Sequence, residues 1–245
     1  MERVPLKRKF IDVAVLFTKE DDFQEICEMA VELGYYGLCV EGLQKQAVIQ
    51  NVIDSYPIKI WSRKTLKGSI SKIKDALGQE RRMHHLISIL AEKPDLAKWA
   101  AKDQRVDSIM VPLTSVGDVF DPTLAKLAAL NGKALEIHFQ EISDAIWSRR
   151  TSLLRNLYNA ASKARQRSCK ILFGSGASKI VHLRAPRDMA ALLNVIGLGY
   201  EEALEIIDDV PLKILQKNEL RLSPGFIAPG TRIIEMEEEK NSRSK

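Results

Sequence analysis

Seven short apolar runs recur along the chain and predict strands that are buried on both faces. They lie at residues 10–16, 37–40, 58–62, 85–90, 107–112, 133–139 and 170–175. Most of them lack the alternation of a half-exposed strand, which is typical of a parallel sheet covered by helices. Apolar positions between the runs recur at helical spacing, as at Phe23, Ile26, Cys27 and Ala30. The pattern therefore predicts strands and helices in alternation.

Two helix-start signals support this alternation. Asp121 followed by Pro122 supplies an N-cap and the residue favoured at the first helical position, and Thr18 with Asp21 resembles a capping box. Repeated βα units form either an open doubly wound sheet or a closed barrel. Periodicity does not separate the two, and no early G-x-G-x-x-G loop indicates the open dinucleotide-binding sheet. Our prediction, which also draws on the resemblance described below, is an α/β fold of the TIM-barrel-like (βα) kind with seven or eight strands.

The apolar pattern ends in the segment LSPGFIAPG, whose paired Pro and Gly residues mark loops. We therefore expect a single βα barrel domain over residues 1–222 and a C-terminal extension over residues 223–245. The last residues of the extension, about ten of them, have the composition of a frayed or disordered terminus.

The composition is that of an ordinary globular protein, with 45% hydrophobic and 28% charged residues. The apolar runs are shorter than the roughly 20 residues that a membrane span needs, and Asp12 interrupts the only stretch that resembles a signal peptide. Three cysteines without CxxC spacing favour reduced, buried thiols over disulfides or a thiolate zinc site. We expect a cytoplasmic protein that does not associate with membranes.

Positive charge is segregated along the chain, although the net charge is only +5. Residues 146–187 contain ten Lys and Arg residues and no Asp or Glu, and residues 55–74 contain six cations and no acid. Such segregation favours a polyanionic partner, because each neutralised phosphate releases condensed counterions. A solvated helix face is the alternative interpretation.

The loop GSGAS at 174–178 follows the last predicted strand, where βα barrels often hold phosphate groups on backbone amides. A tight turn that needs Gly for its backbone angles explains the same residues. Cations surround the loop and favour phosphate binding, so the candidate contacts here are Ser175, Lys170, Lys179, Arg184 and Arg187, followed by Arg167 on charge and position.

Two tryptophans lie beside cations: Trp61 next to Arg63 and Lys64, and Trp147 next to Arg149 and Arg150. Indoles in such settings can stack unpaired bases while the cations bind phosphates. We favour a place in the core for both indoles, and we add the four neighbouring cations to the candidate contacts.

The sequence nominates no catalytic residue, metal site or cofactor. The four histidines show no metal-binding spacing, and Ser175 has no G-x-S-x-G elbow. Asp12 and Glu136 lie in predicted strands and could act as an acid-base pair or bind magnesium, but a structural role is favoured for both.

Two longer segments carry a resemblance: FDPTLAKLAALNGKALEIHF at 120–139 and CKILFGSGASKIVHLRAPRDMAALLNVIGLGYEEALEII at 169–207. They resemble the thirty-kilodalton protein component 3 family of archaeal and eukaryotic ribonuclease P. The shared features are an aspartate before a Leu-Ala-rich helix, the A-L-E-I strand, a small-residue loop and R-x-P-x-D opening a helix. FIDVAV at the N-terminus, LGYYGLCV at 33–40 and VPLKILQKN at 210–218 match more faintly.

The resemblance implies a barrel related to the polymerase and histidinol-phosphatase metalloenzymes, without their metal-binding histidines. It also implies a non-catalytic subunit that binds ribonuclease P RNA, contacts precursor tRNA indirectly and pairs with a small second protein subunit. The residues that match the family pattern are Ser175, Ala177, Arg184, Pro186, Arg187 and Asp188, with Gly176 where relatives often have serine. Arg184 and Arg187 are then the leading phosphate contacts.

Two other hypotheses remain open at this point. The chain could be a metal-dependent phosphoesterase that uses Asp12, Glu136 and His138 as metal ligands. It could also be a metabolic barrel enzyme that binds a phosphorylated metabolite on the 174–178 loop, although the acid-free stretch is hard to explain in that way.

Overall fold

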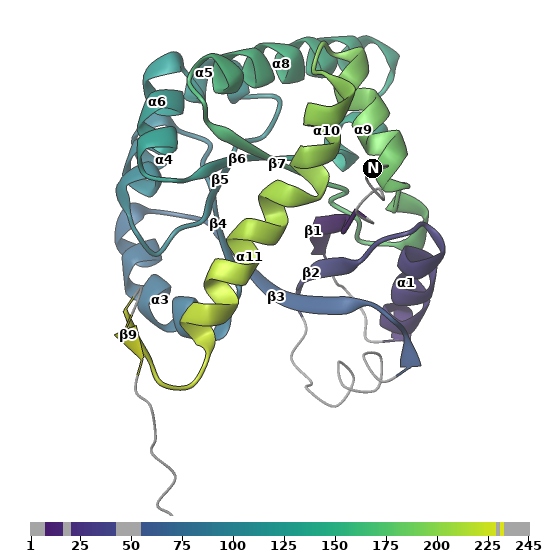
Figure 1. Cartoon of the computed structure of the whole chain (residues 1–245). Coiled ribbons are helices and arrows are strands. Elements are labelled where there is room, and N and C mark those ends of the chain that lie inside the picture. The colour runs from purple at the N-terminus through teal and green to yellow at the C-terminus, as the bar shows by residue number, and fades with distance from the viewer. Residues whose placement is uncertain (1–7, 17–20, 43–54, 229–230, 233–245) are drawn as a thin grey trace, which may run out of the picture.

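The computed structural model describes residues 8–16, 21–42, 55–228 and 231–232 (Figure 1). Its strands are β1 (Ile11–Leu16), β2 (Gly37–Glu41), β3 (Lys59–Leu66), β4 (Leu86–Leu90), β5 (Ser108–Met110), β6 (Ala134–His138), β7 (Lys170–Gly174), β8 (Phe226–Ala228) and β9 (Thr231–Arg232). Its helices are α1 (Asp21–Glu32), α3 (Ile70–Met83), α4 (Pro94–Lys102), α5 (Val116–Val119), α6 (Pro122–Leu130), α7 (Gln140–Ser143), α8 (Trp147–Gln166), the 3-10 turn η1 (Ile180–His182), α9 (Pro186–Val195), α10 (Tyr200–Ile207) and α11 (Asp209–Leu222).

Strands β1 to β7 form one parallel sheet in which each strand pairs with the next along the chain. This confirms all seven predicted strands and the TIM-barrel-like α/β class, because a parallel sheet in sequential order with intervening helices is how such barrels are built. Strand β5 keeps only three residues of the longer predicted run. Helix α6 begins as predicted, since Asp121 Oδ1 accepts a hydrogen bond from the Leu124 amide at 2.6 Å.

The sheet curls until β1 approaches β7. The Leu16 amide donates to the Ala177 carbonyl at 2.7 Å, and Asp12 Oδ1 accepts from the Ser175 amide at 3.0 Å. Gly174 allows this approach, because a Cβ at that position would lie 2.7 Å from Ala14 Cβ. The seven strands therefore nearly close the barrel, and the described part of the chain adds no eighth strand to it.

Helix α11 crosses the amino end of the barrel (Figure 1). Its Ile214 and Leu215 pack with interior residues near the amino ends of the strands, among them Ile11, Trp61 and Leu86. Trp61 is 1% exposed and its Nε1 donates to Glu219 at 2.8 Å, so the prediction that this indole lies in the core is confirmed. A larger core fills the space between the strands and the surrounding helices.

After α11 the chain forms the short antiparallel pair β8–β9. The predicted capping residue Thr18 and the predicted disordered end lie outside the described residues. Among the described helices, none is long and apolar enough to cross a bilayer.

Candidate functional site

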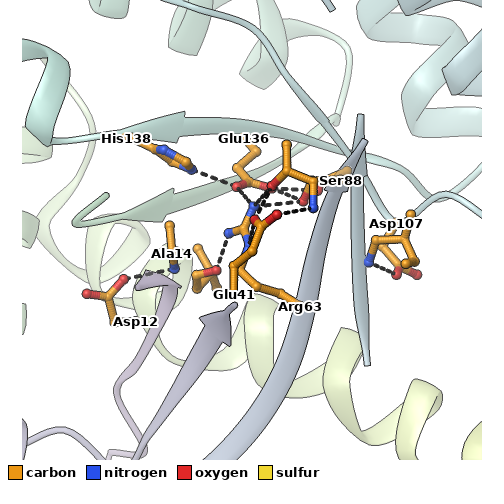
Figure 2. A network of polar contacts seen from close by, with 12 residues as sticks. Asp12, Ala14, Glu41, Arg63, Ser88, Asp107, Glu136 and His138 are labelled. Atoms are coloured by element: carbon orange, nitrogen blue, oxygen red, sulfur yellow. Dashed lines mark hydrogen bonds and ion pairs between the residues drawn. The ribbon is translucent and has the colours of Figure 1, made fainter. Parts of the chain in front are cut away.

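The barrel interior contains a buried ionic network that joins β2, β3, β4, β5 and β6 (Figure 2). Arg63 of β3 lies at its centre with no side-chain exposure, and it donates to Glu136 Oε1 of β6 at 2.8 Å. The same guanidinium also donates to the Val13 carbonyl, Thr65 Oγ1 and Ser88 Oγ, and it pairs with Glu41 at 3.5 Å. A buried charge is tolerated only when it is paired and hydrogen-bonded in this way.

The Glu136 carboxylate is fully engaged within the network. Ser88 Oγ and Ser108 Oγ each donate to its Oε2 at 2.6 Å, and His138 Nε2 lies 2.7 Å from its Oε1. Burial alone would raise the pKa of Glu136, but the charge of Arg63 and the hydrogen bonds from His138 and Ser108 hold this pKa well below its usual value. Glu136 is therefore an ionised structural residue.

The structure contradicts the prediction that Arg63 contacts phosphate. Its complete burial against Glu136 removes it from any phosphate-binding surface. The signal was present in the sequence, because Trp61 and Arg63 lie two residues apart in one strand and so share the inward face. Neighbouring Lys64 is half-buried on the opposite face of β3.

The three residues of the phosphoesterase hypothesis do not form a common site. Asp12 Oδ1 accepts from the Ala14 and Ser175 amides at the β1–β7 junction, while Glu136 and His138 belong to the Arg63 network. In the described ranges, no three His, Cys, Asp or Glu side chains converge in a way that could hold a metal ion.

The environment of the cysteines does not activate them as nucleophiles. All three are buried and free, as the sequence predicts. Burial raises the pKa of Cys27 to about 12 and that of Cys169 to about 11, so neither forms an appreciable fraction of thiolate at neutral pH.

The structure also contradicts the prediction that Ser175 contacts phosphate. Its side chain is fully buried, its hydroxyl accepts from the Ala177 amide at 3.0 Å, and its own amide donates to Asp12. Gly176 has a φ of +71°, so the loop is the tight turn that needs glycine rather than an open phosphate cradle. Two of the amides expected to bind phosphate are therefore already engaged: the Ser175 amide joins β7 to β1 through Asp12, and the Ala177 amide bonds within the loop.

Five cations of the acid-free stretch lie just beyond the carboxyl ends of β6 and β7, where α8, η1 and α9 begin: Arg149, Arg150, Lys179, Arg184 and Arg187. In the part of the chain that the structure describes, none of the five forms an ion pair with a carboxylate. Their charge is therefore available to a ligand.

Two of these guanidiniums are held in place by neighbouring groups. Arg184 Nη1 donates to the Val181 and Leu183 carbonyls at 2.7 Å each, and its guanidinium lies 5.6 Å from the Phe139 ring centroid. Arg150 Nη2 donates to the Ala145 carbonyl at 2.9 Å. Such side chains lose less conformational entropy on binding than free ones do.

Trp147 lies on the same end of the barrel as these cations. Its side chain is 91% exposed at the start of α8, so the prediction that it belongs to the core is wrong. The helical periodicity of α8 points its buried face elsewhere, through Leu153, Leu157 and Ala161. We call Trp147, Arg149, Arg150, Lys179, Arg184 and Arg187 the carboxyl-end surface.

Two further predicted contacts lie at the other end of the barrel. Arg167 ends α8 and Lys170 begins β7, so both are exposed at the amino end of the strands. The structure therefore brings together the cations that follow β6 and β7 and separates them from Arg167 and Lys170. Of the intervening cations, Arg165 pairs with Glu202 and Lys163 donates to the Phe120 carbonyl.

The fold defines the class of the protein as a TIM-barrel-like α/β protein whose interior carboxylate is neutralised by an arginine. A crystal structure of a prolidase shares this barrel, with a TM-score of 0.56 and 13% identity over 92% of this chain and 78% of that one. At that identity the likeness concerns the fold alone.

Sequence comparison gives the family. The profile of the RNase P subunit p30 family matches residues 9–223, so the chain belongs to that family. Ribonuclease P protein component 3 of Methanosarcina acetivorans is 29% identical over 95% of this chain and 98% of its own length. A chain in a cryo-EM structure of archaeal ribonuclease P with mature tRNA has a TM-score of 0.79 and 22% identity, covering 94% of this chain and all of that one.

Proposed function

We propose that this protein is a non-catalytic subunit of ribonuclease P that binds and stabilises the catalytic RNA during 5′-end maturation of precursor tRNA. Family membership over residues 9–223 is the observation that carries the proposal. The relatives are named as ribonuclease P protein component 3, and the similar solved chain belongs to a ribonuclease P assembly with tRNA. The expected cytoplasmic location belongs to the same proposal.

The carboxyl-end surface supports RNA as the ligand. It combines five cations that lack carboxylate partners in the described ranges with one exposed indole, and this is the combination that binds phosphates and stacks unpaired bases. Arg184 and Arg187 are the leading phosphate contacts, and Arg149, Arg150 and Lys179 extend the surface. Lys64, Arg167 and Lys170 lie outside it.

The barrel interior supports a non-catalytic role. In metal-dependent barrels, carboxylates and histidines at the carboxyl ends of the strands bind the metal or move protons. Here Glu136 has its oxygens occupied by Arg63, Ser88, Ser108 and His138. The RNA subunit would then supply the catalysis, and the protein would stabilise the folded RNA and pair with the small second protein subunit.

The direct test is a titration of the protein into its cognate ribonuclease P RNA over a range of salt concentrations. Arg184→Ala/Arg187→Ala is compared with Lys98→Ala/Lys126→Ala, a control pair that is exposed on α4 and α6. We expect steeply salt-dependent binding by the wild type and a slope reduced by about 1.4 to 1.8 in the arginine variant, at roughly 0.7 to 0.9 per phosphate contact. Wild-type binding that does not depend on salt would refute the proposal.

A further inference from the structure

A cavity of about 130 Å³ lies at the amino end of the barrel, opposite the carboxyl-end surface. It is bounded by the loops that lead into β5 and β6, by the first residue of β7 and by one face of α11. Its lining residues include four lysines, which come from three separate parts of the chain: Lys133, Lys170, Lys213 and Lys217. We call this cavity and its lysines the amino-end pocket.

Lys133 is the buried member of the pocket. Only 3% of its surface is exposed, and its Nζ donates to the Val106 carbonyl at 2.7 Å. An ammonium group has three N–H donors, and the carbonyl satisfies one of them. Burial, with Lys217 and Arg221 nearby, lowers the pKa of Lys133 to about 8 even though Asp107 and Asp103 oppose the shift.

The acidic groups around the pocket are already occupied. Asp107 itself lines the cavity. Its Oδ2 accepts from Arg81 and the Ile87 amide, and its Oδ1 accepts from Asn218 at 2.9 Å. Asp103 forms two hydrogen bonds with the Arg105 guanidinium. Asp209 pairs with Lys213 at 2.6 Å on the exposed side of α11. Among the described residues, Lys170 and Lys217 have no carboxylate partner.

Like charges gathered around one cavity repel each other, and an anion that enters the cavity removes this cost. A phosphate group fits the chemistry, because its oxygens accept hydrogen bonds from several ammonium groups at once. Asn131 and Gln104 also line the cavity and add amide groups to it.

We propose that the amino-end pocket binds a backbone phosphate of the same RNA, as a second contact separate from the carboxyl-end surface. This inference rests on the proposed RNA-binding function. The protein then holds two segments of RNA, one at each end of its barrel. Helix α11 supplies Lys213 and Lys217 to the pocket. Barrel enzymes act at the carboxyl ends of their strands, so an enzymatic function would leave these two lysines without a role.

The first test compares RNA binding by Lys170→Gln/Lys217→Gln with binding by Lys98→Gln/Lys126→Gln across a range of salt concentrations. All four lysines are exposed, so both variants keep the fold, which circular dichroism verifies. We expect the pocket variant to lose about 0.7 to 0.9 from the salt slope, the contribution of one phosphate contact, and the control to keep the wild-type slope. Equal slopes for the pocket variant and the wild type, or equal losses in both variants, overturn the pocket while the proposed function stands. Absence of salt-dependent RNA binding by the wild type overturns both.

The second test maps the two contacts on the RNA. Lys217→Cys and Arg187→Cys each carry an iron chelate that cleaves nearby nucleotides, and the native thiols are buried and poorly ionised. Two separate groups of cleaved nucleotides are expected. Cleavage at one shared group, or none from position 217, overturns the second contact. Two further results also overturn the second contact, each if RNA binding by the pocket variant is unchanged. The first is saturable binding of inorganic phosphate to the wild-type pocket, and the second is loss of the second protein subunit from the pocket variant.

Discussion

Replacing Arg63 by methionine tests whether this residue neutralises the barrel interior. Methionine keeps an unbranched apolar side chain but leaves the Glu136 carboxylate, which has no exposed surface, without its cation. Removing one partner of a buried ion pair costs about 3 to 5 kcal/mol. Four acceptors also lose a donor: Val13 O, Thr65 Oγ1, Ser88 Oγ and Glu136 Oε1. We therefore expect the free energy of unfolding at pH 7 to fall by at least about 3 kcal/mol.

The difference in unfolding free energy between the wild type and Arg63→Met is also expected to depend on pH. In the wild type the pKa of Glu136 is depressed, so its stabilising contribution is present above the unfolded pKa of about 4.3 and is lost as the pH falls below that value. In Arg63→Met, burial without the guanidinium raises the pKa of Glu136. The Glu136 carboxylate therefore takes up a proton as the pH falls from 7 toward 5, and this removes the cost of its unpaired buried charge. The stability gap between the two proteins therefore narrows over that range.

Urea unfolding followed by circular dichroism at pH 7 and pH 5 measures both effects. Arg82→Met is the control, since Arg82 is exposed on the neighbouring α3, and it is expected to change stability by no more than about 0.5 kcal/mol. A loss below about 1 kcal/mol for Arg63→Met at pH 7, or a stability gap that widens toward pH 5, would show that Arg63 does not neutralise Glu136 in the barrel interior.

Three further predictions concern the barrel junction and the surface. Asp12→Ala leaves two buried amides without an acceptor and is expected to cost about 1 to 3 kcal/mol for each in urea unfolding, whereas Asp12→Asn keeps an acceptor oxygen and costs less; equal costs would contradict this role. Gly174→Ala forces a Cβ to within 2.7 Å of Ala14 and is expected to cost about 1 to 3 kcal/mol, while Gly78→Ala in α3 meets nothing and stabilises by up to about 1 kcal/mol; the reverse order would be inconsistent with closure at Gly174. Trp147→Ala is expected to weaken RNA binding by about 1 to 3 kcal/mol in a filter-binding titration while unfolding stays within about 0.5 kcal/mol, and unchanged binding would exclude stacking.

The strands were the most predictable part of the fold. Their runs are apolar on both faces because each strand meets helices outside and packed side chains inside, and this pattern is local in the sequence. Near-closure of the barrel was less predictable, because it depends on Asp12 accepting the Ser175 amide across 163 positions of sequence. No periodicity reports such a contact.

The candidate site was predictable only in part. Charge alone does not separate a surface cation from Arg63, whose partner Glu136 is supplied by a distant strand. Conversely, the order of elements within a βα unit does separate Lys170, at the start of β7, from Arg184, beyond its end, and that information was available in the sequence. The amino-end pocket was not predictable, because it forms only when α11 packs across the strands.

The most direct test of ribonuclease P RNA as the partner of this protein is to purify the protein from its native cells and sequence the RNA that accompanies it. We expect ribonuclease P RNA to be the main enriched species and Arg184→Ala/Arg187→Ala to reduce its recovery. Recovery of the intact protein without ribonuclease P RNA, under salt conditions that preserve ribonucleoprotein complexes, would contradict this expectation.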